Sequence, residues 1–343
     1  MSDTSTAIRA TEGKPDFALG TVNLASPKLG ARIVETSDEF FGPAERMLND
    51  APPIFFPDRF DDNGKWMDGW ESRRRRHGGH DHCIIKLGAK AVLAGFEINT
   101  RFFTGNHPPQ ASIEGAMIDG LPDENTEWTE IVPSSAIAPD AHNLFPVDTD
   151  QPFNCLRLNM FPDGGIARFR VWGNPVCEWK QADTDGLHEL SAIVNAGRVI
   201  GYSDAHYGDP WVILTPGRGE NMGDGWETRR RREPGNDWIV IALGAGGNVK
   251  RIEIDTAHFR GNYPDRCNIL AARLAPAPDA DIVAASDSWA ELLPEQKLQM
   301  HHIHTFDAPA INDLGPVTHI RLNIYPDGGI SRVRIFGQLA AED

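Results

Sequence analysis

The stretch RLNMFPDGGIARFRVWG, residues 157–173, returns later in the chain as RLNIYPDGGISRVRIFG, residues 321–337. In both copies, apolar and polar side chains alternate on either side of the turn sequence PDGG. Such alternation is typical of half-buried β-strands, and Asp-Gly is a strong turn signal because glycine tolerates a positive φ. Each copy therefore predicts two antiparallel strands joined as a hairpin.

Two more blocks recur in the same order. DGWESRRRR at residues 68–76 matches DGWETRRRR at 224–232, and GFEINTRFFTGNHP at 95–108 matches RIEIDTAHFRGNYP at 251–264. A period this long indicates a duplicated domain, because solenoid repeats run at about 20–50 residues. We expect a polar N-terminal tail at 1–24, a first repeat at 25–174, a linker at 175–194 and a second repeat at 195–338.

The fold class follows from the many short alternating segments, which are separated by glycine- and proline-rich turns. They predict an all-β protein built from two sandwiches or jelly rolls, with short helical patterns only near Glu39 and Trp289. A second hairpin is expected in each repeat; in the second repeat it runs from 239–243 through a turn at 244–248 into 249–255. Its entering and leaving loops, which carry the recurring DGWE and GN blocks, should meet at one rim of the sandwich, where sites are common.

Composition narrows the class of partner. The 343 residues are 40% hydrophobic and carry a formal net charge of −16, which disfavours nucleic acid. No apolar run approaches the roughly 18 residues of a membrane-spanning helix, and the polar N-terminus does not resemble a signal peptide. Four scattered cysteines, of which Cys83 and Cys155 lie in apolar runs, predict free buried thiols and a cytoplasmic location.

The recurring blocks resemble the allantoicase family. The resemblance rests on GDGWETRRRR, NDWIVIALG, DTAHFRGNYP and LNIYPDGGISRVRIFG, with their first-repeat counterparts, and covers nearly the whole chain outside the tail. It implies a double jelly roll of the galactose-binding-like type and hydrolysis of allantoate to ureidoglycolate and urea. The repeats differ in one loop, where Asp255, His258 and Arg260 are replaced by Asn99, Phe102 and Thr104.

The chemistry of that reaction selects candidate residues. Allantoate joins a carboxylate and two ureido groups at one carbon, so losing urea calls for a general acid, a base for water and an arginine for the carboxylate. The predicted catalytic residues are Asp224, Glu227, Asp255 and His258. The predicted substrate-binding residues are Arg229, Arg231, Arg260 and Asn262 in the second repeat, with Asp68, Glu71, Arg73 and Asn106 in the first.

Each motif also has a structural interpretation. The arginine quartets suit solvated, salt-bridged loops, and Trp70 and Trp226 suit packing at a sandwich end. The arginines on either side of PDGG suit cross-strand ion pairs. No metal site is predicted, because His80 and His82, like His302 and His304, lack the further ligands of a zinc site. No cofactor is required, although a divalent metal is not excluded.

Two rival functions remain open at this point. The first is a non-catalytic tandem jelly-roll module that binds a small polar ligand, and the second is a related ureido or amidine hydrolase. The convergence of acidic, basic and cationic groups favours the enzyme with allantoate as its small-molecule partner, without nucleic acid or membrane. Homo-oligomerisation is left open.

Overall fold

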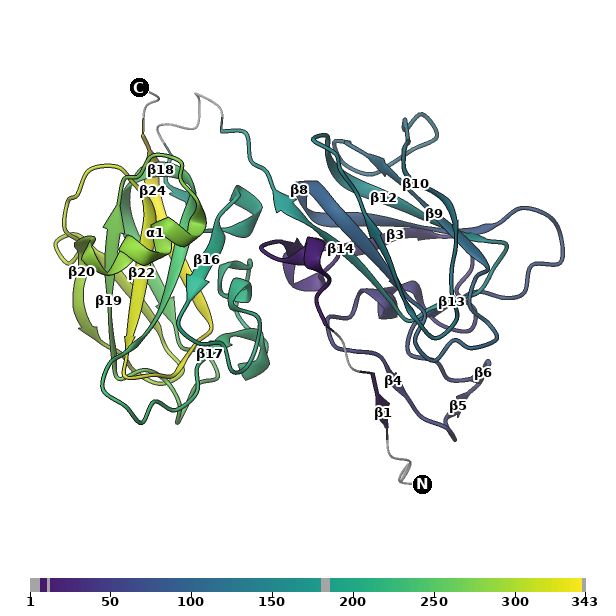
Figure 1. The fold of residues 1–343 in the computed structure, drawn as a ribbon, viewed down its shortest axis with the longest axis horizontal. Helices are drawn as coiled ribbons and strands as arrows, with labels where there is room; N and C mark the ends of the chain where they lie inside the picture. The colour runs from purple at the N-terminus through teal and green to yellow at the C-terminus, as the bar shows by residue number, and fades with distance from the viewer. Residues whose placement is uncertain (1–6, 11–12, 180–185, 341–343) are drawn as a thin grey trace. The chain divides into compact units, whose positions relative to one another are not determined.

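The computed structural model describes residues 7–10, 13–179 and 186–340. The chain divides into two compact units, Met1–Val176 and Cys177–Asp343, which we call the first and the second repeat (Figure 1). Strands dominate both, so the predicted all-β fold is confirmed. Residues 1–6 and 11–12 of the expected tail and 180–185 of the expected linker lie outside the described residues.

One long strand, β8 (Asp81–Asn99), organises the first repeat. Its first part pairs with β3 (Arg32–Thr36) and β12 (Pro152–Phe161), and its last part pairs with β11 (His142–Pro146) and β14 (Arg168–Pro175). The strand therefore passes from one layer of the sandwich into the other. Three further strands extend the layers: β9 (Gln110–Ala116) and β10 (Thr129–Ala136) beyond β12, and β2 (Val22–Asn23) beyond β14.

The second repeat is built around the equivalent strand β18 (Asp237–Asp255). Its first part pairs with β16 (Arg198–Tyr202) and β22 (Val317–Tyr325). Its last part pairs with β21 (Ile303–Asp307) and β24 (Arg332–Leu339). The remaining strands are β19 (Arg266–Ala272) and β20 (Ala290–Lys297) beside β22, and β15 (His188–Glu189) beside β24.

The predicted hairpins are wrong in their pairing. The strands on either side of PDGG, β12 and β14, pair with different parts of β8 rather than with each other, and the two parts of β18 also have separate partners. Each segment is an arch that joins two layers. Alternation identifies a strand with one buried face, but the same pattern serves a hairpin and an arch, because both bury that face.

The two loops that precede and follow the long strand nevertheless lie at one rim, as predicted. Asp237, at the start of β18, lies opposite Ile324, and Asp255, at its end, lies opposite Arg332. Ile324 and Arg332 flank the PDGG turn of the second repeat. Both ends of β18 therefore lie at the end of the sandwich where this turn lies.

A buried ion pair fastens the site loop of each repeat. In the first repeat, Arg168 Nη2 lies 2.6 Å from Asp68 Oδ2, and the arginine also donates to the backbone oxygens of Asp68 and Ala51. Arg168 is only 1% exposed. The expected cross-strand pairing is confirmed instead at Arg157, which lies opposite Glu114 and makes two hydrogen bonds with it.

The tryptophans of the DGWE blocks pack as predicted. Trp70 and Trp226 are fully buried, and each indole donates to a backbone oxygen, of Asp38 and Asp204 respectively. The short strands that contain them, β7 (Trp70–Glu71) and β17 (Trp226–Glu227), pair with β13 (Gly165–Ile166) and β23 (Gly329–Ile330), which follow the PDGG turns. These bridges bring the two recurring blocks together.

The predicted helices differ from those observed. The segment after Trp289 forms strand β20, because its pairing with β19 outweighs a weak helical pattern that already contains Pro294. Near Glu39 only a 3-10 turn forms, η3 (Ala44–Leu48). Among the described residues the α-helix is α1 (Asp279–Ala285), which the sequence analysis did not predict.

The described part of the expected tail packs on the first repeat. Strand β1 (Ile8–Arg9) pairs with β4 (Ile54–Phe55), and β2 pairs with β14. Ala18, Val22 and Leu24 are buried. The prediction of free buried thiols is confirmed at Cys83, Cys155 and Cys267.

No helix among the described residues has the length and apolar character needed to cross a membrane.

The buried pair yields a stability prediction. Asp68→Ala removes the carboxylate that neutralises Arg168, and we expect it to lower the free energy of unfolding by about 3–5 kcal/mol, because the guanidinium stays buried without its counter-charge. Urea unfolding followed by tryptophan fluorescence measures the change. The control is Asp307→Ala, which breaks the exposed pair with Arg251 and should shift the midpoint far less. Equal shifts in both variants would contradict the anchoring role.

Candidate active site

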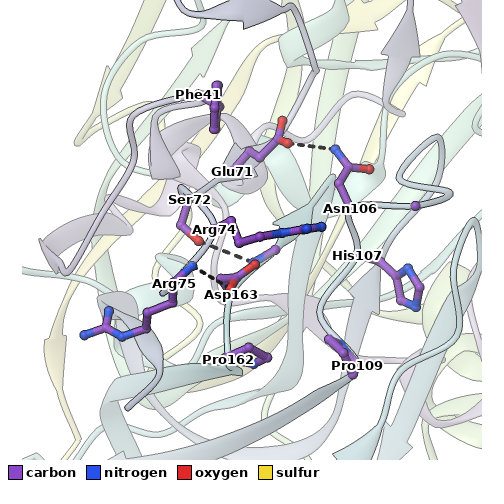
Figure 2. Close-up of a pocket in the computed structure, with 12 residues that line it drawn as sticks. Phe41, Glu71, Ser72, Arg74, Arg75, Asn106, His107, Pro109, Pro162 and Asp163 are labelled. Atoms are coloured by element: carbon purple, nitrogen blue, oxygen red, sulfur yellow. Dashed lines mark hydrogen bonds between the residues drawn. The ribbon is translucent and has the colours of Figure 1, made fainter. Parts of the chain in front are cut away.

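The first repeat joins its two recurring loops by a direct side-chain contact. Glu71 ends strand β7, and Asn106 lies in the loop that follows β8. Asn106 Nδ2 donates to Glu71 Oε1 at 2.7 Å, as drawn in Figure 2. The predicted convergence of the loops at one rim is therefore confirmed.

A cavity of about 460 Å³ opens at this contact. Its floor is polar, with the Glu71–Asn106 pair and the PDGG turn, and Phe41 adds an apolar wall (Figure 2). The lining residues come from four segments of the chain: Phe41; Glu71, Ser72, Arg74 and Arg75; Gly105, Asn106, His107 and Pro109; and Pro162, Asp163 and Gly164. The size suits a small polar molecule.

Close packing fixes the PDGG turn against the loop that carries Asn106. A Cβ atom on Gly164 would lie 2.5 Å from the backbone nitrogen of Pro108, and Gly164 has a φ of +153°. Only glycine fits this approach without a shift of the backbone. Gly165 N donates to Asn106 O at 2.7 Å, so the turn also orients the asparagine.

The arginine quartet divides by alternation. Arg73 pairs with Asp38 at 2.6 Å and Arg75 pairs with Asp81, so both guanidinium groups are held by carboxylates. Successive side chains of an extended segment point to opposite sides, and Arg74 lines the cavity. Within the described part of the chain, no acidic side chain pairs with Arg74. Of the two arginines of this segment that line the cavity, Arg74 and Arg75, Arg75 is bound to Asp81, which leaves the Arg74 guanidinium available for a ligand.

The environment of Glu71 raises the pKa of its carboxyl group. Burial raises the pKa of the Glu71 carboxyl, and the negative charge of Asp61 adds to the rise. The hydrogen bond from Asn106 opposes both, because it stabilises the carboxylate. A carboxyl group with a raised pKa next to a polar cavity is suited to donate a proton.

The second repeat carries the same arrangement. Asn262 Nδ2 donates to Glu227 Oε1, as Asn106 does to Glu71. Arg229 pairs with Asp204 and Arg231 with Asp237, each at 2.8 Å. The predicted ligands Arg73, Arg229 and Arg231 are thus all held in ion pairs.

The other predicted residues of the second repeat lie apart from Glu227. Asp224 forms a buried pair with Arg332 at 3.0 Å, the counterpart of Asp68 with Arg168. Asp255 pairs with Arg218 at 3.0 Å. Among the described residues, neither Asp255 nor His258 shares a hydrogen bond with Glu227, which bonds to Asn262 instead.

His258 and its neighbours form a separate cluster. His258 Nε2 donates to the backbone oxygen of Gly219 at 2.7 Å, and its backbone N–H donates to His301 Nδ1. Desolvation is the largest cause that lowers the pKa of His301, and the positive charge of Arg260 lowers it further. The Arg260 side chain is exposed. In the first repeat, Phe102 keeps the same positive φ as His258 but stacks on Phe55, with ring centroids 5.5 Å apart. The replacement therefore exchanges a hydrogen-bonded loop for an apolar contact.

The sequence analysis missed Arg74, Phe41 and His107 as cavity residues. Arg74 had a usable signal, since an extended run of four arginines must divide into two faces and the acidic residues Asp38 and Asp81 can hold only one of them. The sequence carries no signal that would identify Phe41 and His107, because the conformation of their loops places each of them at the cavity. In the described residues, no group of three or more His, Cys, Asp or Glu side chains is arranged to hold a metal ion.

Comparison with known proteins agrees with this geometry. The family model of the allantoicase repeat matches residues 22–176 and 188–340. A probable allantoicase of Ralstonia nicotianae is 52% identical over 326 residues, which is 95% of this chain and 97% of the relative. Another, from Rhizobium meliloti, is 50% identical over 335 residues, covering 97% of this chain and 98% of its own.

A solved structure extends the agreement to the fold. The crystal structure of allantoicase from Saccharomyces cerevisiae matches with a TM-score of 0.76 at 35% identity, and covers 92% of this chain and 93% of that chain. Both matched segments of the family model contain the Glu–Asn contact and the buried Asp–Arg pair. The chain therefore belongs to the allantoicase family.

Proposed function

We propose that this protein hydrolyses allantoate to ureidoglycolate and urea in the cavity of the first repeat. The observation that carries the proposal is that Arg74, which has no acidic partner among the described residues, lines the same cavity as a Glu–Asn pair. The names of the relatives support the substrate. The polar lining and the volume of about 460 Å³ support a small molecule rather than a polymer.

The cavity has a partner for each group of allantoate. Arg74 takes the carboxylate through a two-pronged contact, which an arginine supplies better than a lysine. Asp163 accepts from ureido N–H groups, and Asn106 offers its amide to a ureido oxygen while it holds Glu71. Phe41 covers the apolar C–H side of the central carbon.

Glu71 supplies the proton transfers. Its protonated carboxyl gives a proton to the ureido nitrogen that leaves, and the bond between that nitrogen and the central carbon breaks to release urea. The remaining ureido nitrogen shares its lone pair with the carbon, which becomes an acyl-iminium centre. Water adds to this carbon and gives its proton to the Glu71 carboxylate, which restores the acid and completes ureidoglycolate.

The predicted roles of Asp224, Asp255 and His258 in acid–base chemistry remain predictions. We propose structural roles for them instead, since Asp224 neutralises a buried arginine and His258 donates to a backbone oxygen. The cytoplasmic location also remains a prediction.

The first prediction concerns the proposed acid. Purified protein supplied with allantoate should release urea, and Glu71→Gln should lower kcat by about 10²–10⁴-fold, the usual contribution of a general acid. The glutamine keeps the hydrogen-bonding shape but cannot transfer the proton. Urea release is measured colorimetrically. Undiminished kcat in the variant would exclude Glu71, and absence of urea from the unmodified protein would favour a binding module or another substrate.

A second prediction separates the two faces of the arginine quartet. Arg74→Ala should raise KM for allantoate by about 10–100-fold, because a hydrogen-bonded contact between charged groups contributes about 1.5–3 kcal/mol. Arg73→Ala is the matched control on the neighbouring position, where the guanidinium is held by Asp38, and should change KM far less. The opposite ranking in steady-state assays would overturn the assignment of Arg74.

A third prediction concerns pH. Asn106 stabilises the carboxylate of Glu71, so Asn106→Ala should raise the pKa of Glu71 further above its ordinary value. Since the protonated acid is the active form, activity is lost as pH rises through this pKa, and the alkaline limb of the kcat profile should move to higher pH. Asn154→Ala, which removes contacts to the backbone of Ile118, should leave that limb in place. A shift to lower pH for Asn106→Ala would contradict Glu71 as the acid.

A further inference from the structure

The second repeat reproduces the ligand-binding groups of the first, contact by contact. Glu227 and Asn262 repeat the hydrogen bond of Glu71 and Asn106. The PDGG turn is held in the same way in each repeat, since Arg75 N donates to Asp163 and Arg231 N donates to Asp327, both at 2.8 Å. The two rims therefore share an acid, an amide and a turn carboxylate in the same order.

The cation is duplicated as well. Arg229 and Arg231 are held by Asp204 and Asp237, and Arg230 between them is exposed. Arg230 lines an open hollow together with Asp204 and Asp237, but those two carboxylates are bound to the neighbouring arginines. Within the described part of the second repeat, no acidic side chain pairs with Arg230. The presence of this arginine is therefore not explained by an ion pair within the fold.

The backbone segments of the second rim pack as closely as those of the first. A Cβ atom on Gly328 would lie 2.7 Å from Pro264 N, as one on Gly164 would approach Pro108 N. Gly328 N donates to Thr228 Oγ1 at 3.1 Å, where Gly164 N donates to Ser72 Oγ. Such close packing holds Asn262 and Asp327 in fixed positions around Glu227.

The walls of the two rims differ. In the first repeat a hairpin of β5 (Phe60–Asp61) and β6 (Gly64–Lys65) supports the cavity wall. Asn63 Nδ2 donates to Phe40 O at 2.8 Å, and a Cβ on Gly64 would lie 3.7 Å from the Phe41 ring. Among the described residues 203–226, the second repeat has no corresponding strand pair.

Two tyrosines border the second rim. Tyr207, whose backbone bridges to Glu227, is 58% exposed and packs edge-on against His206. Tyr263 stands where the first repeat has His107. Such a rim keeps the groups that bind a ligand but excludes less water from it.

We propose that the second repeat contains a second binding site for a ligand that carries one carboxylate and a ureido group. Arg230 holds the carboxylate, and Glu227, Asn262 and Asp327 hold the ureido group. The ligand class follows from the proposed function of the first repeat, because the same donors and acceptors recur. The second site binds this ligand whether or not the first repeat hydrolyses allantoate.

The test is equilibrium binding of N-carbamoylglycine, which has the carboxylate and one ureido group but lacks the second ureido group that would leave. Isothermal titration of the full-length protein should give two equivalents bound per chain. Arg230→Ala and Glu227→Gln should each reduce this to one, and Arg74→Ala should remove the other. The exposed position of Arg230 makes its replacement harmless to folding, and far-ultraviolet circular dichroism verifies this.

The outcomes separate this inference from the proposed function. One equivalent or none in the unmodified protein, or a stoichiometry that Arg230→Ala does not change, overturns the second site and leaves urea release unaffected. Two equivalents that depend on Arg230 and Arg74, in a protein that releases no urea from allantoate, would keep the second site and overturn the hydrolysis.

Discussion

A buried guanidinium bound to an aspartate holds each site loop onto its sandwich. Arg168 lies on the strand that follows the PDGG turn, and Asp68 begins the DGWE block 100 residues earlier. Because the arginine is removed from water, its charge must be neutralised where it lies, and the backbone oxygens around it must point inward. The same constraint recurs at Arg332 and Asp224. The positions of Glu71 and Glu227, three residues beyond these aspartates, follow from it.

The long strands β8 and β18 supply the second condition for the site. Each runs through both layers of its sandwich, so its beginning and its end return to the same rim. The arginine quartet precedes the strand, and the asparagine of the site follows it. A sandwich built from separate short strands could place these loops at opposite ends. The crossing strand prevents that, and the PDGG turn packs between the two loops.

The two repeats differ where their surroundings differ, while the groups at the rim stay alike. Phe102 and His258 occupy the same backbone conformation, yet one stacks on Phe55 and the other bonds to the backbone of Gly219. Each side chain suits the segment that covers it, so this difference concerns the support of the loop.

The sequence by itself determined the duplication, the all-β class and the meeting of two loops at one rim, because long ordered repeats and a period of two report directly on domains and on strands with one buried face. Only the tertiary structure decided which strands pair, since an arch and a hairpin bury the same face. It also decided which arginines are held in ion pairs: Arg73 and Arg75 contact carboxylates that folding brings close, and Arg74 has no such contact among the described residues. Ion pairs between distant segments depend on positions in space, and for that reason the charge pattern along the chain could not separate the paired arginines from the unpaired one.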